Sequence, residues 1–178
     1  MLRTGSVRFY LFLVSALMAV PPFAAQTAKQ TVPPAPIPSQ ILTGNKVFIS
    51  NAGVTARYLS SYVVDHTGSV NGLYDEFYAA MKNWGRYELV SSPAEADLVF
   101  EISLSQEGPN PQLDPLVGLK ILDLKTHTVL WAFVEPVPAG SGREATRRRA
   151  WEQALAKLVN DVRQLTGQPP APAVAPNK

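Results

Sequence analysis

Two stretches of the chain carry apolar residues at the spacing of an amphipathic helix. The first runs from Leu73 to Trp84, and Gly85 follows where a left-handed residue would end a helix. The second is longer and stops at Gly167; its apolar stripe comprises Trp151, Leu155, Leu158, Val162 and Leu165. This pattern predicts two helices, each with one face directed towards a core.

Five shorter segments have the composition or alternation of β-strands. The clearest is Leu98 to Leu104, where apolar residues alternate with Val99, Glu101 and Ser103. The others are 46–50, 87–90, 116–124 and 128–134, the last two forming a hairpin whose reversal lies at Asp123 to His127.

The resulting element order is β-α-β-β-β-β-α. It predicts an α/β (α+β) fold in which a single mixed sheet of about five strands carries two helices on one face. Between the first strand and the first helix, Thr67-Gly68 and Asn71-Gly72 are turn signals, so we expect residues 54–72 to form a long loop with room for one helical turn.

The N-terminus has the layout of a secretory signal peptide. Arg3 and Arg8 precede an apolar run over residues 9–20, which ends at Pro21-Pro22 and is followed by small residues at 24, 25 and 28. A membrane anchor is the alternative, but this run is shorter than the roughly 20 apolar residues of a spanning helix. We therefore predict that residues 1–25 are removed on export.

Proline-rich composition marks both flanks of the predicted domain. Residues 26–44 are expected to form a disordered linker, residues 45–167 the α/β domain, and residues 168–178 a disordered Pro/Ala-rich tail. A docking role for the linker is an alternative to a simple spacer.

Charge and cysteine content narrow the range of partners. The chain has a net charge of +2 and no cysteine. Because residues 1–25 contain two arginines and no acid, the predicted mature chain is neutral, which argues against a nucleic-acid partner. Disulfides, thiolate metal sites and a lipid-modified N-terminal cysteine are excluded.

Five segments of the folded part form a recognisable ordered set: Phe48–Gly53, Phe77–Ala80, Trp84–Val90, Ala96–Glu101 and Asp123–Trp131. Together, over residues 47–167, they resemble a family of small exported bacterial proteins of unassigned function. More remotely they are similar to the N-terminal domain of the Tol-system propeller protein and to lipoproteins of curli secretion and penicillin-binding-protein activation. The resemblance implies a domain that binds partners, and it supplies no catalytic residues.

Familiar catalytic motifs are missing from the sequence. There is no phosphate-binding glycine loop, no Gly-x-Ser-x-Gly elbow and no paired-histidine metal motif, so we predict no catalytic residue, cofactor or metal ion. Asp65-His66 with serines nearby leaves a small hydrolase as an alternative to a surface loop, and His127 is expected at a hairpin tip. Asp97, at the start of a strand, is interpreted as the cap of a turn, and Asp123 as a residue that bonds the backbone of its own reversal.

One charge cluster and one aromatic group remain as candidate binding residues. Arg143, Arg147, Arg148 and Arg149 lie at the start of the last helix, where the helix dipole disfavours cations. They could contact an anionic lipid, glycan or acidic partner, or form a solvated face in which Glu144 pairs with Arg148. A tyrosine group could likewise stack on a sugar or pack under the long loop: Tyr58, Tyr62, Tyr74 and Tyr78.

These observations favour an exported, non-enzymatic interaction domain of the bacterial cell envelope, periplasmic or secreted, with no transmembrane segment in the mature chain. Its expected partner is an envelope protein or a glycan. A small secreted hydrolase or a carbohydrate-binding module is the alternative. The sequence leaves the oligomeric state open.

Overall fold

The computed structural model describes residues 35–55, 57–106, 114–138 and 143–169, all within the unit Ala35–Lys178. The helices are α1 (Ser39–Thr43), α2 (Arg57–Thr67), α3 (Gly72–Trp84) and α4 (Glu144–Leu165), with one 3₁₀ turn, η1 (Pro93–Glu95). The strands are β1 (Lys46–Val54), β2 (Glu88–Val90), β3 (Leu98–Ser105), β4 (Leu116–Asp123) and β5 (Thr128–Pro136). The predicted signal peptide, most of the linker and the end of the tail lie outside the described residues.

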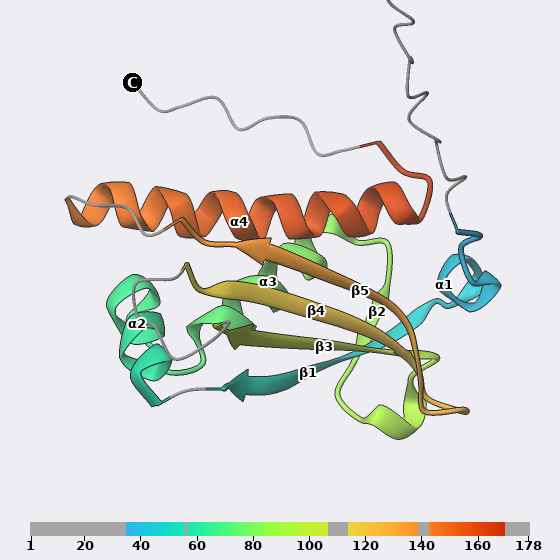
Figure 1. Ribbon diagram of the computed structural model, residues 1–178. Coiled ribbons are helices and arrows are strands. Elements are labelled where there is room, and N and C mark those ends of the chain that lie inside the picture. Colours follow the sequence, from blue (N-terminus) through green and yellow to red (C-terminus); the bar gives the residue numbers. More distant parts are fainter. Residues whose placement is uncertain (1–34, 56, 107–113, 139–142, 170–178) are drawn as a thin grey trace, which may run out of the picture. The chain divides into compact units, whose positions relative to one another are not determined.

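The five strands form one mixed sheet in the order β2-β1-β3-β4-β5 (Figure 1). β1 pairs in parallel with both β2 and β3, whereas β3, β4 and β5 form an antiparallel meander. The predicted α+β class and single mixed sheet are therefore confirmed. β1 lies between two strands that follow it in the chain, because α3 carries the chain back to the start of β2 beside it.

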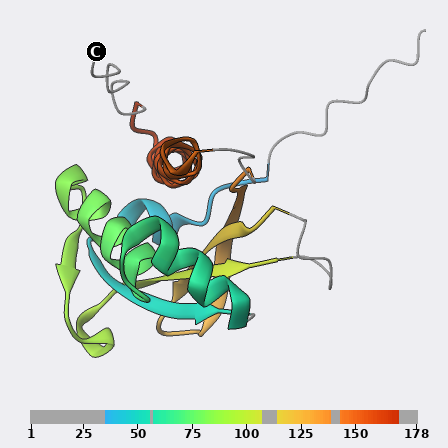
Figure 2. The same cartoon turned by 90° about the vertical axis from the view of Figure 1, so that its left-hand side faces the viewer.

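One face of the sheet holds the core. Every second residue of β3 and β4 is buried there, together with Val47 and Ile49 of β1. The buried residues of α2, α3 and α4 belong to the same core, so these helices pack on that face, with α4 seen nearly end-on in Figure 2. Trp151, Phe77 and Phe100 are the largest fully buried side chains. The helix-covered face and the apolar stripes of α3 and α4 agree with the prediction.

The opposite face of the sheet, which we call the open face, carries no helix among the described residues. Its members alternate with the core residues along each strand. They include Phe48, Ser50, Val99, Glu101, Ser103, Gly118, Lys120, Leu122, Val129, Ala132 and Val134.

The predicted long loop over residues 54–72 is wrong, because most of it is helix α2. Leu59 and Val63 are one turn apart and fully buried in the core, which gives the segment a reason to be helical. Thr67-Gly68 marks the end of this helix instead of a loop, since Gly68 has φ 77°. Three helices therefore cover the sheet, one more than predicted.

The predicted boundary between linker and domain also lies too late in the chain. Residues 39–43 form the short helix α1, and Ile41 is fully buried in the core. The folded part therefore begins before the expected position 45, because Ile41 of this Pro-rich segment is buried in the core. None of the helices in the described part is long and apolar enough to cross a membrane.

Candidate functional site

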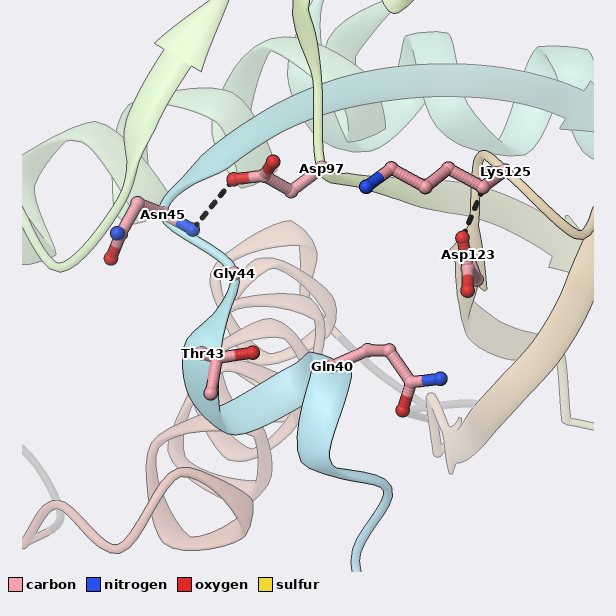
Figure 3. Close-up of a pocket in the computed structure, with 7 residues that line it drawn as sticks. All are labelled: Gln40, Thr43, Gly44, Asn45, Asp97, Asp123 and Lys125. Atoms are coloured by element: carbon pink, nitrogen blue, oxygen red, sulfur yellow. Dashed lines mark hydrogen bonds between the residues drawn. The ribbon is translucent and has the colours of Figure 1, made fainter.

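A polar pocket of about 310 Å³ lies where α1 turns into β1 (Figure 3). Its walls come from α1, from the residue before β3, from the end of β4 and from the β4–β5 turn. The lining residues are Gln40, Thr43, Gly44, Asn45, Asp97, Asp123 and Lys125. Gly44 is required at the turn, because a Cβ there would lie 2.9 Å from both the Gln40 carbonyl oxygen and Leu98 Cδ1.

Asp97 fixes the start of β1 from across the pocket. Its Oδ2 accepts hydrogen bonds of 3.0 Å from the backbone N–H groups of Asn45 and Lys46. These bonds, with Lys46 the stronger cause, lower the pKa of the carboxyl group below its ordinary value. The backbone groups that Asp97 binds are therefore remote in the sequence and lie at the start of β1, which pairs with β3.

Asp123 and Lys125 form the other wall. Asp123 is buried, and its Oδ1 accepts a 2.8 Å hydrogen bond from the Lys125 backbone N–H, as predicted for a residue that stabilises its own reversal. The Lys125 side chain points towards Asp97 in Figure 3, and its positive charge acts on the Asp97 carboxylate. The pocket thus offers one cation and two carboxylates to a small polar ligand.

No signal in the sequence pointed to this pocket. Gln40 lies in the predicted linker and Lys125 in the predicted hairpin turn, and Asp97 was interpreted as the cap of a turn. Each residue is ordinary in its own segment, so only the meeting of four segments in space makes a pocket.

The predicted arginine cluster does not form a single site, because Arg148 is occupied by the protein itself. Its Nη2 lies 2.8 Å from Glu76 Oε1 and its Nε donates to Glu152 Oε1 at 2.8 Å. Its Nη1 donates to the His66 carbonyl oxygen. Partial burial opposes the charge, but the hydrogen bonds to Glu152 and Glu76 outweigh it and raise the pKa of Arg148. The expected pair with Glu144 is replaced by these contacts.

The other three arginines differ in how exposed their side chains are. Arg143 and Arg149 are exposed, whereas Arg147 is half-buried and close enough to Tyr62 to act on its phenol. An anion-binding role for these residues stays a prediction, with Arg148 removed from it.

His66 is not in a surface loop, as the sequence suggested, but at the end of α2 with only 9% of its area exposed. Its Nδ1 lies 2.7 Å from the Tyr62 carbonyl oxygen and therefore donates to it. The ring stacks on Tyr62 with centroids 4.0 Å apart, and Trp151 lies 5.9 Å away. The ring nitrogen that a triad would use to hold a carboxylate is thus bound to the backbone.

Burial raises the pKa of Tyr62 to about 12, with the nearby charge of Asp114 acting in the same direction. Tyr62 packs against the core cluster from helix α2, whereas the packing alternative had placed it under a long loop. Tyr74 and Tyr78 are half-buried neighbours with ring centroids 6.0 Å apart, and nothing of the Tyr58 side chain is described.

His127 occupies the hairpin tip as expected, in a left-handed conformation with φ 54°. Within the described ranges, no three metal-ligating side chains gather into a possible metal site.

Comparison with known proteins identifies no family. No protein-family model matches the chain, and no curated protein matches it.

Several solved structures are similar to this chain. Protein XCC0632 from Xanthomonas campestris (DUF330) is 17% identical, covering 74% of this chain and 89% of that chain, with a TM-score of 0.47. Uncharacterized lipoprotein B from Nitrosomonas europaea is 14% identical; the match covers 75% of this chain and 91% of that chain, with a TM-score of 0.41. Lipoprotein GNA1162 from Neisseria meningitidis is 11% identical; the match covers 65% of this chain and 96% of that chain, with a TM-score of 0.37.

At these identities and TM-scores the likeness assigns no function to this chain. The predicted similarity to the Tol-system, curli-secretion and penicillin-binding-protein-activator domains stays a prediction.

Proposed function

We propose that this chain is an exported, non-enzymatic interaction domain of the bacterial cell envelope, and that the open face of its sheet contacts a protein partner. The observation that carries the proposal is the composition of this face. A sheet face left to water is normally polar. Here Val129 and Val134 are 48% and 58% exposed, and Phe48, Val99 and Leu122 are half-buried beside them.

The open face also has a polar centre. Lys120 and Glu101 form an ion pair of 3.2 Å between β4 and β3, with Ser103 nearby on the same strand as Glu101. Protein-binding surfaces combine apolar area with polar groups, and the opposite charges of Lys120 and Glu101 neutralise each other on this face. The predicted signal peptide would deliver such a surface to the envelope.

The non-enzymatic part of the proposal rests on how candidate catalytic groups are used. His66 is stacked and bound to the backbone, and Asp97 holds two backbone N–H groups. Both roles are structural, and the other ring nitrogen of His66, Nε2, is buried and therefore not open to a substrate. The Asp65-His66 pair therefore gives little support to the hydrolase alternative.

Site-specific photo-crosslinking in the bacterium tests the interaction. A photoreactive residue at Lys120, in the centre of the open face, should give an adduct with an envelope protein. The matched control is Gln153, an exposed residue of α4 on the helix side of the molecule. Adducts of equal yield at both positions, or none at Lys120, would contradict the proposal.

Two further measurements test export and the absence of catalysis. Fractionation with N-terminal sequencing should find a mature chain that begins between Gln26 and Lys29, outside the cytoplasm. A panel of esterase, phosphatase and glycosidase substrates should show no turnover. Turnover that disappears in a folded His66→Gln variant would establish the hydrolase instead.

A further inference from the structure

The pocket between α1 and the β4–β5 turn contains carboxylate groups that the fold uses only in part. Asp97 binds the start of β1 through Oδ2 alone, and its Oδ1 makes no hydrogen bond within the described part of the chain. Asp123 is similar: its Oδ1 accepts the Lys125 backbone N–H, whereas its Oδ2 has no partner among the described residues. Each carboxylate therefore keeps one oxygen available to a ligand.

Asp123 is the more informative of the two, because its side chain is buried. Only 6% of the residue is exposed. A buried carboxylate oxygen without a hydrogen bond is costly unless something in the site satisfies it. Its Oδ2 is not sealed off from solvent, and Asp123 forms part of the pocket wall. The buried side chain thus presents an unused acceptor to the pocket.

Lys125 provides the opposite charge. It is exposed, it points towards Asp97 in Figure 3, and its charge acts on the Asp97 carboxylate. Lys125 takes part in none of the ion pairs that the described residues form. Its ammonium nitrogen therefore lies beyond the roughly 4 Å of a direct ion pair with either carboxylate. A gap of this kind between opposite charges has room for a small molecule that carries both.

The rest of the wall is polar and uncharged. Gln40 extends from α1 towards the wall formed by the β4–β5 turn (Figure 3). The Thr43 hydroxyl donates to the Ser39 carbonyl oxygen at 3.0 Å and can still accept a hydrogen bond. Sites for drug-sized molecules measure about 300–1,000 Å³, so a pocket of about 310 Å³ suits a smaller ligand. With Gly44 as the one lining residue without a polar side chain, such a ligand would be recognised by its charges.

We propose that this pocket binds a free α-amino acid, with the ammonium group between Asp97 and Asp123 and the carboxylate on Lys125. An α-amino acid carries both charges on a single carbon atom, as closely spaced opposite charges in the pocket require. Its ammonium group has three donors, which suit Asp97 Oδ1, Asp123 Oδ2 and Gln40 Oε1. This inference concerns the pocket and stands independently of the function proposed for the open face.

The charge of the pocket also predicts which amino acids bind. Its walls carry two carboxylates and one ammonium group, so one negative charge remains in excess. A ligand with a second carboxylate would be repelled, whereas a second ammonium group would be attracted. Neutral and basic amino acids should therefore bind more tightly than acidic ones.

An NMR titration of the full exported chain tests the class of ligand. Alanine and lysine should cause saturable shifts of the backbone amide signals of Asn45, Lys46 and Lys125, because these N–H groups bind the two carboxylates. Ethylamine is alanine without its carboxylate, and propionate is alanine without its ammonium group. Each of them, and glutamate, should bind at least about tenfold more weakly than alanine. No saturation with alanine or lysine, or equal affinity for ethylamine, propionate or glutamate, would overturn the proposal.

Two substitutions remove a charge and keep the contact that holds the turn. Asp123→Asn retains an oxygen for the Lys125 backbone N–H, and Lys125→Gln leaves that N–H in place. Each should weaken alanine binding by at least about tenfold. The matched control is Lys82→Gln, which removes an exposed lysine from α3 and should leave the affinity unchanged. Thermal melts confirm that the variants fold. Unchanged affinity in folded Lys125→Gln, or an equal loss in Lys82→Gln, would overturn the proposal.

Discussion

Arg148 joins three helices, and removing its side chain should therefore cost more than loss of a surface charge. It binds Glu76 on α3, Glu152 on α4 and the carbonyl oxygen at the end of α2. Glu76 also accepts a 2.7 Å hydrogen bond from Trp151 Nε1, so the guanidinium group and the largest buried side chain share one carboxylate. The sequence alone, which paired Arg148 with Glu144, predicts almost no effect.

The expected cost follows from exposure. Fully exposed ion pairs contribute about 0.2–1 kcal/mol, whereas hydrogen bonds to charged groups contribute about 1.5–3 kcal/mol when protected from water. The Arg148 side chain is 37% exposed and that of Glu76 is 25% exposed, so their ion pair is neither fully exposed nor fully protected from water. We therefore expect Arg148→Ala to lower the free energy of unfolding by about 2 kcal/mol, or roughly 4–8 °C in Tm for a domain of this size.

Thermal and urea unfolding of three variants measures this loss in the free energy of unfolding. Arg149→Ala, which removes an exposed arginine from the next position of α4, is the matched control and should change the free energy by less than about 0.5 kcal/mol. Arg148→Lys should fall between the two, because lysine keeps the charge but cannot make the same forked contacts. Equal stability of Arg148→Ala and Arg149→Ala would refute the reasoning.

Three further outcomes are expected. Leu158 is fully buried, so Leu158→Ala should cost about 2–5 kcal/mol by the same melts, and a silent substitution would mean that α4 is not packed on the sheet. The N–H groups at the start of β1 lower the pKa of Asp97, so the Asp97 carboxylate stabilises the fold above its ordinary pKa, and this stabilisation is lost as pH falls through the lowered value. In urea titrations, the difference in free energy of unfolding between the wild type and Asp97→Asn should vanish in that acid range. Burial raises the pKa of Tyr62 to about 12, so its contribution is complete below its ordinary pKa near 10 and lost as pH rises towards 12; the tyrosinate absorbance of the folded chain should lose this late component in Tyr62→Phe.

The local pattern of apolar residues predicted the elements that bury one face. The alternation in β3 and the helical stripes of α3 and α4 repeat often enough to identify both the type of element and its buried side. Glycines at 85 and 167 ended helices as expected, since both adopt positive φ. The mixed sheet, the single helix-covered face and the β4–β5 hairpin therefore followed from the sequence.

Two short helices were missed for a physical reason. Among the described side chains of α2 only Leu59 and Val63 are fully buried, and in α1 only Ile41 is, so neither helix repeats a pattern long enough to be recognised. Such helices are marginal on their own and form because the sheet provides a surface for one or two apolar side chains.

The candidate sites depended on contacts between residues far apart in the sequence. Asp97 looked like a local cap but holds the start of β1, and Arg148 looked exposed but meets Glu76 from another helix. Periodicity along the chain reports which side of an element is apolar, because that is a local property. It does not report which polar groups from different elements meet, because strand order and helix placement decide those distances. The sequence alone therefore determined the class of fold and its buried face, whereas the tertiary structure decided the pocket and the arginine network.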